Sequence, residues 1–178
     1  MRRRDVCGVL TLLVYLLGVG LFTGPSLYQL LVGRLAAPRL ALIPFTDILS
    51  VLRDPNAPGL GVVANIAGNV VLLAPLGLLL PLFWDWFGQA RRTIGLAFAV
   101  SLSIELIQLI AGGVTSVDDL LLNTLGAALG WAAAKLLLRL FPRLAPRRTR
   151  RPAWGYPLSC WLAVIAIATV SDVLQLGL

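Results

Sequence analysis

The chain contains no histidine and only two cysteines among its 178 residues, and only 13% of the side chains are charged. Cys7 and Cys160 lie in apolar runs with no pairing motif. Metal sites built from histidine and cysteine are therefore excluded, and each cysteine is expected to be a small buried hydrophobic side chain. No nucleophile elbow or metal-ligand spacing is present either. The sequence predicts no cofactor.

The net charge of +7 comes from arginines in short runs between apolar segments. Surfaces that bind single strands interleave basic and aromatic side chains, and no such pattern occurs here. We therefore exclude nucleic acid as a partner. The arginine runs instead indicate which loops stay on the cytoplasmic side of a membrane.

Apolar residues are abundant: 58% of the chain is hydrophobic, and the mean hydropathy is +0.89. Several apolar runs approach the roughly 20 residues that a helix needs to cross a bilayer. We predict an all-α, polytopic transmembrane bundle without a separate soluble domain, a single membrane domain over residues 1–178. The expected spans cover about residues 6–22, 61–83, 93–111, 117–141 and 156–176.

The segments around these spans differ in composition. Residues 2–4 are arginines before a long apolar run with no small-x-small cleavage site, which indicates an uncleaved first span rather than a signal peptide. Residues 40–52 are predicted to lie at the interface as a short amphipathic piece. A polybasic linker at 142–154 precedes an additional C-terminal span within 155–178.

Counting arginines predicts the orientation. With the N-terminus in the cytoplasm, residues 2–4, 91–92 and the basic cluster from 139 to 151 all lie inside, and only Arg34, Arg39 and Arg53 lie outside. The opposite orientation would export the polybasic linker, which the positive-inside rule disfavours. The C-terminus is therefore expected outside.

In that orientation the polar residues of three spans share one depth. Asn69 lies about 12 Å in from Gly61, Glu105 about 10 Å in from Gly112, and Asn123 about 7 Å in from Asp118. Because the hydrocarbon core is about 30 Å thick, these groups all fall in its outer third. We predict a polar pocket that opens to the outer face of the membrane.

Simpler roles remain open for several of these groups. Asn65 and Asn69, four residues apart on one helical face, serve equally well as hydrogen-bonding contacts between helices. Ser116 to Asp119 matches a capping box, with Asp119 facing the positive end of the helix dipole and Asp118 as a solvated first-turn acid. Asn123 also suits a bond to a neighbouring backbone.

Glu105 is harder to explain as a structural residue. An ionised group at bilayer depth costs about 2.5–3.5 kcal/mol on insertion scales. The carboxyl is therefore either protonated or paired with a partner such as Asn69, Gln108 or Arg53. We expect Glu105 to act in the site or to organise it.

The motifs that carry these residues resemble the VanZ-like membrane family. They are Asn65-Ile-Ala-Gly-Asn69, Ser103-Ile-Glu-Leu-Ile-Gln108 and Val117-Asp-Asp-Leu-Leu-Leu-Asn-Thr-Leu-Gly126, with Ile43-Pro-Phe45 upstream. The resemblance covers about residues 40–135. It implies a small bundle in the bacterial cytoplasmic membrane and an association with resistance to the glycopeptide teicoplanin. It marks these pocket residues: Asn65, Asn69, Glu105, Gln108, Asp118, Asp119 and Asn123.

The chain departs from the family pattern at one turn. The family often has an arginine after the glycine that ends the third span, and an aspartate two residues before the Asp-Asp pair. This chain has Gly113 and Ser116 there. Recognition of an anion by this turn is therefore in question, and Arg53 is the substitute that we consider.

Three functions compete. The first is a non-enzymatic envelope protein whose pocket binds a lipid headgroup, a lipid-linked wall precursor or an amphiphilic antibiotic. The second is an intramembrane enzyme with Glu105 as general base and Asp118 or Asp119 as acid or as ligand to a hard cation such as Mg²⁺. The third is a transporter subunit, although no inverted repeat is visible. A homo-oligomer through the Gly126/Gly130 helix is a further prediction.

Overall fold

The structure, a computed structural model, describes residues 3–24, 26–31, 39–41, 43–45, 59–111, 114–146 and 152–175. In this part of the chain five helices are long and apolar enough to cross a membrane. The all-α polytopic fold predicted from apolar run lengths is therefore confirmed. The five helices are α1 (Arg3–Thr23), α4 (Gly59–Phe83), α5 (Ala90–Ile110), α6 (Val117–Leu140) and α7 (Gly155–Gln175).

The remaining elements are short. A parallel strand pair, β1 (Arg39–Ala41) and β2 (Val114–Ser116), aligns Arg39 with Val114 and Ala41 with Ser116. The expected amphipathic piece at 40–52 therefore begins as a strand, because its backbone pairs with the turn before α6. Residues 46–52 lie outside the described residues. The other short elements are α2 (Tyr28–Leu31), η1 (Asp85–Gly88) and η2 (Pro142–Leu144).

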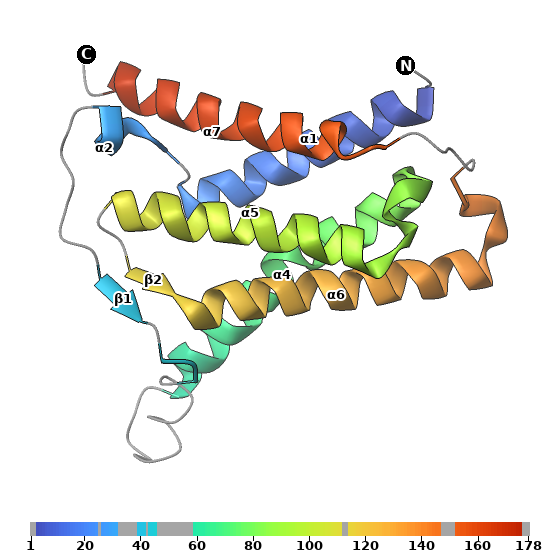
Figure 1. Ribbon diagram of the computed structural model, residues 1–178, viewed down its shortest axis with the longest axis horizontal. Helices are drawn as coiled ribbons and strands as arrows, with labels where there is room; N and C mark the ends of the chain where they lie inside the picture. Colours follow the sequence, from blue (N-terminus) through green and yellow to red (C-terminus); the bar gives the residue numbers. More distant parts are fainter. Residues whose placement is uncertain are drawn as a thin grey trace.

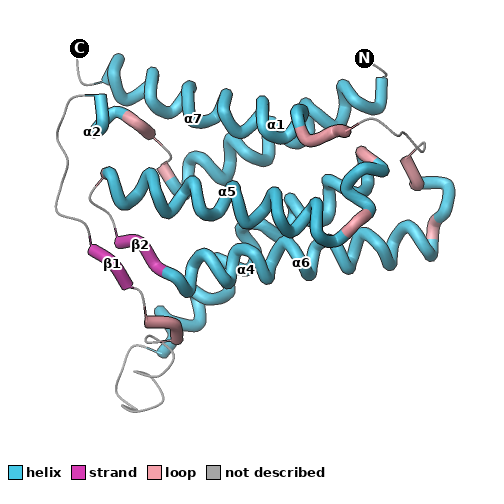
Figure 2. The backbone as a smooth tube through the Cα atoms, in the orientation of Figure 1, coloured by secondary structure: helices cyan, strands magenta, loops and turns pink. Residues whose placement is uncertain are grey.

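The long helices alternate in direction (Figure 1). α1, α5 and α7 end where α4 and α6 begin, and both strands lie at this same end, which we call the strand end (Figures 1 and 2). The start of α1 and the end of α7 consequently lie at opposite ends of the bundle, as an odd number of spans requires. Which end faces the cytoplasm stays a prediction from the arginine count.

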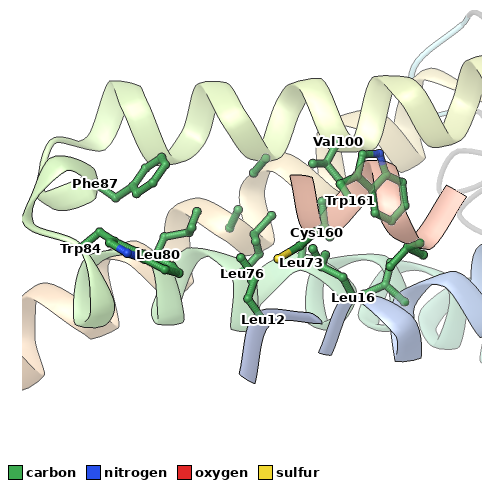
Figure 3. Packing of buried hydrophobic residues seen from close by; sticks show 14 of the residues in the cluster. Leu12, Leu16, Leu73, Leu76, Leu80, Trp84, Phe87, Val100, Cys160 and Trp161 are labelled. Carbon is green, nitrogen blue, oxygen red and sulfur yellow. The ribbon is translucent and has the colours of Figure 1, made fainter. Parts of the chain in front are cut away.

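The hydrophobic core joins α1, α4, α5 and α7 (Figure 3). Trp161 of α7 is almost fully buried, and its indole N–H donates to the hydroxyl of Ser103 on α5 (2.8 Å). This bond satisfies a polar group that would otherwise be unpaired in an apolar core. The C-terminal span therefore packs directly against a motif helix. Buried side chains of the core include Leu12, Leu16, Leu73, Leu76, Leu80, Val100, Cys160 and Trp161.

The two cysteines differ in burial. Cys160 is buried in this core, as expected for a small hydrophobic side chain, and its thiol lies 3.8 Å from the carbonyl oxygen of Val9. Cys7 is exposed, so the expectation was wrong there. Cys7 lies near the start of α1, on a side of the helix that no described segment covers, and an apolar thiol is compatible with lipid at such a position.

α4 and α6 approach each other closely through glycines. A Cβ atom at Gly126 would lie 1.9 Å from the carbonyl oxygen of Val70, and one at Gly130 would lie 1.9 Å from that of Ala74. On α4, a Cβ at Gly77 would lie 1.9 Å from the carbonyl oxygen of Ala127. Only glycine permits this contact, in line with the role of small residues between membrane helices.

Arg4 links helix ends at the side of the bundle away from the strands. Its guanidinium donates to the carbonyl oxygens of Leu82 (2.7 Å), Ala145 (3.0 Å) and Leu144. These carbonyls belong to the last turn of α4 and to the segment after α6, where backbone acceptors lack intrahelical donors. A cation is also favoured there by the helix dipoles. Arg4 therefore fixes the start of α1 against the ends of two other spans.

The glycine contact predicts a large difference between two substitutions on α4. Gly77→Ala should destabilise the protein by about 2 kcal/mol or more, because the new methyl group collides with the backbone of α6. Gly68 has nothing within 4 Å of its Cβ position. Gly68→Ala should therefore leave stability unchanged or raise it by up to about 1 kcal/mol. Thermal unfolding in detergent measures both, and equal midpoints would contradict the close approach.

Candidate functional site

The first turn of α6 is capped by residues from two directions. The Ser116 hydroxyl accepts the backbone N–H of Asp118 (3.2 Å), which is the N-cap bond that the sequence predicts. In a capping box the third helical residue, Asp119, would accept the Ser116 N–H in return. Here Glu105 of α5 accepts that N–H through Oε2 (2.9 Å). Thr115 also donates to the carbonyl oxygen of Glu105 (3.0 Å).

Glu105 therefore connects α5 to the start of α6. Its side chain is only 3% exposed, so the contact is shielded from solvent. The partners expected from the sequence lie elsewhere: Asn69 and Gln108 bond to other groups, and Arg53 lies outside the described residues. A backbone N–H is thus the hydrogen-bond partner that the structure gives this carboxyl group.

Glu105 takes the capping role, and Asp119 contacts α4. Its Oδ1 accepts from the amide of Asn69 (2.6 Å) and, at the limit of hydrogen bonding, from that of Asn65 (3.5 Å). The Asn69 amide also lies 3.4 Å from Oδ1 of Asn65. We call Asn65, Asn69 and Asp119 the amide–carboxylate cluster. It joins the second and third turns of α4 to the first turn of α6 near the strand end.

Asp118 points to the segment after β1. Its two carboxylate oxygens accept the backbone N–H of Phe45 at 2.8 and 3.0 Å. Phe45 has φ of 63°, a left-handed conformation that costs a bulky residue about 1–3 kcal/mol. The bond to Asp118 helps to hold this unfavourable backbone in place. Asp118 is therefore not simply a solvated acid at a helix start.

A cavity of about 230 Å³ lies between α4 and α6 beside the cluster. Asn65 and Asp118 provide its polar groups, and Phe45 closes part of it. The rest of the wall is aliphatic: Val62, Ile66, Leu121, Leu122 and Leu125. The space thus combines an apolar interior with carboxylate and amide groups that accept and donate hydrogen bonds.

Asn123 and Gln108 lie apart from this cavity. Asn123 is 2% exposed and donates to the Ser101 hydroxyl (3.1 Å), which joins α6 to α5, and its Oδ1 has no donor among the described residues. The amide of Gln108 donates to the carbonyl oxygen of Thr23 at the end of α1 (3.4 Å). Both contacts join helices, but the partner of Asn123 is a side-chain hydroxyl and not the neighbouring backbone that was considered for it.

Five of the seven predicted residues thus lie in neighbouring places at the strand end, whereas Gln108 and Asn123 make separate contacts with α1 and α5. Asn65, Asn69 and Asp119 form one cluster, with Asp118 and Asn65 on the cavity wall. Glu105 is one contact away, through Ser116. The cavity also uses Phe45, which no argument from charge or polarity selects; only its place in the Ile43-Pro-Phe45 motif singled it out.

Within the described ranges, no group of three histidine, cysteine, aspartate or glutamate residues is arranged to hold a metal ion. Glu105 and Asp118 each already accept backbone N–H groups, which suits positioning more than proton transfer. Hydrogen-bond acceptors of this kind bind hydroxyl or ammonium donors well.

Comparison with known proteins gives the same assignment as the motifs. The VanZ/LLP1 family model matches residues 8–139, most of the chain. The chain belongs to this family. The match includes α1, upstream of the motif-bearing stretch, and ends near the end of α6. No curated protein and no solved structure matches the chain. The protein is therefore a multi-pass membrane protein of VanZ type.

Two substitutions of Glu105 distinguish the effect of losing its hydrogen bond to Ser116 from the effect of losing its carboxyl group. Glu105→Ala leaves the Ser116 N–H without its acceptor and should destabilise this VanZ-family protein by about 1–3 kcal/mol. Glu105→Gln keeps an oxygen that accepts this N–H, so the loss should be less than about half as large. Thermal unfolding in detergent measures both. Equal losses would show that the bond to Ser116 does not explain the role of Glu105 in folding.

The cluster predicts unequal roles for the two asparagines. Asn69→Ala removes the 2.6 Å bond to Asp119 and should cost about 1.5–3 kcal/mol, as bonds to charged groups do. Asn65→Ala removes contacts of 3.4–3.5 Å and should cost clearly less. A double-mutant cycle with Asp119→Ala measures each coupling. A coupling for Asn65 as large as that for Asn69 would contradict the geometry.

Proposed function

We propose that the protein is a non-enzymatic binding protein of the bacterial cell envelope, located in the cytoplasmic membrane. Its pocket at the outer leaflet binds the polar part of an amphiphile. The candidate ligands are a lipid headgroup, a lipid-linked wall precursor and a glycopeptide antibiotic such as teicoplanin, so that the protein serves resistance or envelope integrity.

One observation carries this proposal: a cavity between two spans has Asn65 and Asp118 on its wall and the amide–carboxylate cluster beside it. Binding sites typically combine apolar walls with a few well-placed polar groups. The carboxylate of Asp118 on the cavity wall suits a ligand that donates hydrogen bonds, such as a sugar hydroxyl, an amine or an amide. Two asparagine amides provide donors for a carbonyl or phosphate group.

The placement of basic residues supports an outward-facing pocket. Arg4, Arg91, Arg92, Arg139 and Arg143 belong to the end of the bundle away from the strands. Under the positive-inside rule that end faces the cytoplasm, and the strand end then faces the wall. A pocket at the strand end is accessible to molecules that reach the outer leaflet.

The main alternative is an enzyme with Glu105 as general base and Asp118 or Asp119 as acid. A base must lie within hydrogen-bond reach of the proton that it abstracts. Glu105 is buried, is bonded to Ser116, and is not part of the cavity wall. The contacts therefore favour binding over catalysis.

Association of copies remains a prediction. The Gly126/Gly130 face of α6 packs against α4 of the same chain, with separations that leave no room for a second copy. A homo-oligomer therefore needs another face, and the aliphatic outer surfaces of the spans are available for it.

Photo-crosslinking tests the proposal. Lipid and lipid-linked precursor probes with a diazirine in the headgroup are reconstituted with the native protein, Asn69→Ala, Glu105→Gln and the control Gln89→Ala. Gln89 is exposed and lies at the other end of the bundle. We expect labelling of the strand end to fall at least about threefold in Asn69→Ala, which corresponds to the loss of one modest hydrogen bond. Equal labelling of all four proteins would refute the proposal.

A further inference from the structure

The cavity between α4 and α6 has a composition that points to one part of an amphiphile. Among the described residues, its wall has Phe45 and five aliphatic side chains beside Asn65 and Asp118: Val62, Ile66, Leu121, Leu122 and Leu125. Such a wall offers dispersion and apolar burial along its length but few hydrogen bonds. It therefore suits a hydrocarbon chain better than a sugar or a peptide.

The size of the cavity limits how much of a ligand it can hold. Pockets that enclose a drug-sized molecule usually measure about 300–1,000 Å³. This one measures about 230 Å³ and is only partly enclosed. It therefore holds a segment of a ligand, and the remainder stays outside among the groups at its rim.

The direction of the cavity matches that of a lipid in a bilayer. Asp118 is in the first turn of α6, and Leu125 lies about 10 Å further along the same helix. The polar end therefore coincides with the end of the spans, and the aliphatic end extends about a third of the way into the roughly 30 Å hydrocarbon core. Leu125 and the neighbouring Val63 are also exposed, so this groove borders the lipid phase.

We propose that the groove holds one acyl chain of a membrane phospholipid, with Phe45 on its wall at the polar end. This inference rests on the proposed function for the polar part of the ligand and adds the chemistry of the remainder. A free antibiotic core or a water-soluble headgroup would not fill this space, whereas every lipid-linked ligand carries such a chain.

Asp118 acts in this site as a positioning residue for Phe45. It accepts the Phe45 backbone N–H with both oxygens, and Phe45, which has a left-handed backbone conformation, lies on the wall of the groove. Phe45 therefore limits how the hydrocarbon chain lies at the polar end, and a smaller residue there should accept bulkier ligands.

Native mass spectrometry of the full chain, purified in mild detergent, tests the inference. The native protein should retain one diacyl phospholipid per chain. Leu122→Trp fills the groove and should lower retention at least about tenfold, because several methylene groups lose their apolar contact. Leu129→Trp is the matched control, since Leu129 lies on the same helix, is 54% exposed and is not on the cavity wall. Equal retention by the two variants would overturn the inference.

A second measurement needs no substitution in the groove. A phosphatidylcholine with a diazirine on its acyl chain is photolysed in proteoliposomes at trace concentration, and the labelled residues are mapped. Labels on residues 62–66 and 121–125 should exceed those on the exposed positions Leu129 and Leu136 at least about fivefold, since a bound chain stays longer than a passing one. Uniform labelling of these positions would overturn the inference even if Leu122→Trp failed to fold.

These outcomes separate the chain site from the headgroup site. Lipid loss in Leu122→Trp, together with headgroup labelling that is insensitive to Asn69→Ala, would support the chain site and refute the polar pocket. The reverse pattern would refute the chain site and leave the polar pocket in place.

Discussion

The direct contact between the backbones of α4 and α6 is the constraint on which the rest of the site depends. Glycines allow the two helices to approach until carbonyl oxygens occupy the positions where side chains would begin. The contact places Val70 beside Gly126 and Ala74 beside Gly130, so the helices run in the same direction with a fixed register. Towards the strand end the helices carry larger side chains. There Asn69 meets Asp119, and a cavity remains beside them.

The spans could be predicted from the sequence because the bilayer sets both their length and their polarity. Each predicted span differs from the observed helix by only a few residues, as at Gly155–Gln175 for the last one. The strand pair was not predictable in this way. Residues 39–41 and 114–116 are too short to show a periodic pattern, and their pairing depends on where α4 and α5 place them. The glycine pair on α6 was recognised as a site of close helix approach, but the contact of Gly77 with Ala127 was not, because the sequence does not show which helix faces meet.

The site was only partly predictable for a related reason. The approximate depth of the polar residues followed from helix rise, and the Ser116 cap followed from its spacing to Asp118. The sequence did not predict that Glu105, and not Asp119, accepts the Ser116 N–H. A capping box assumes that the acceptor for this N–H comes from the same helix. Gln108 shares a helical stripe with Glu105, yet it bonds to the end of α1, a segment with no motif of its own. Helix periodicity shows on which face of a helix a residue lies, but not which residue of another segment it contacts.

The strand pair also has a consequence for how the chain assembles. β1 precedes α4 and β2 follows α5, so the partners Arg39 and Val114 are separated by an entire helical hairpin. During synthesis, residues 39–41 cannot pair with residues 114–116 until α4 and α5 have been made and the turn after α5 has reached the same side of the bilayer. Closure of the strand pair then brings the segment after β1 to the start of α6, where Asp118 accepts the backbone N–H of Phe45.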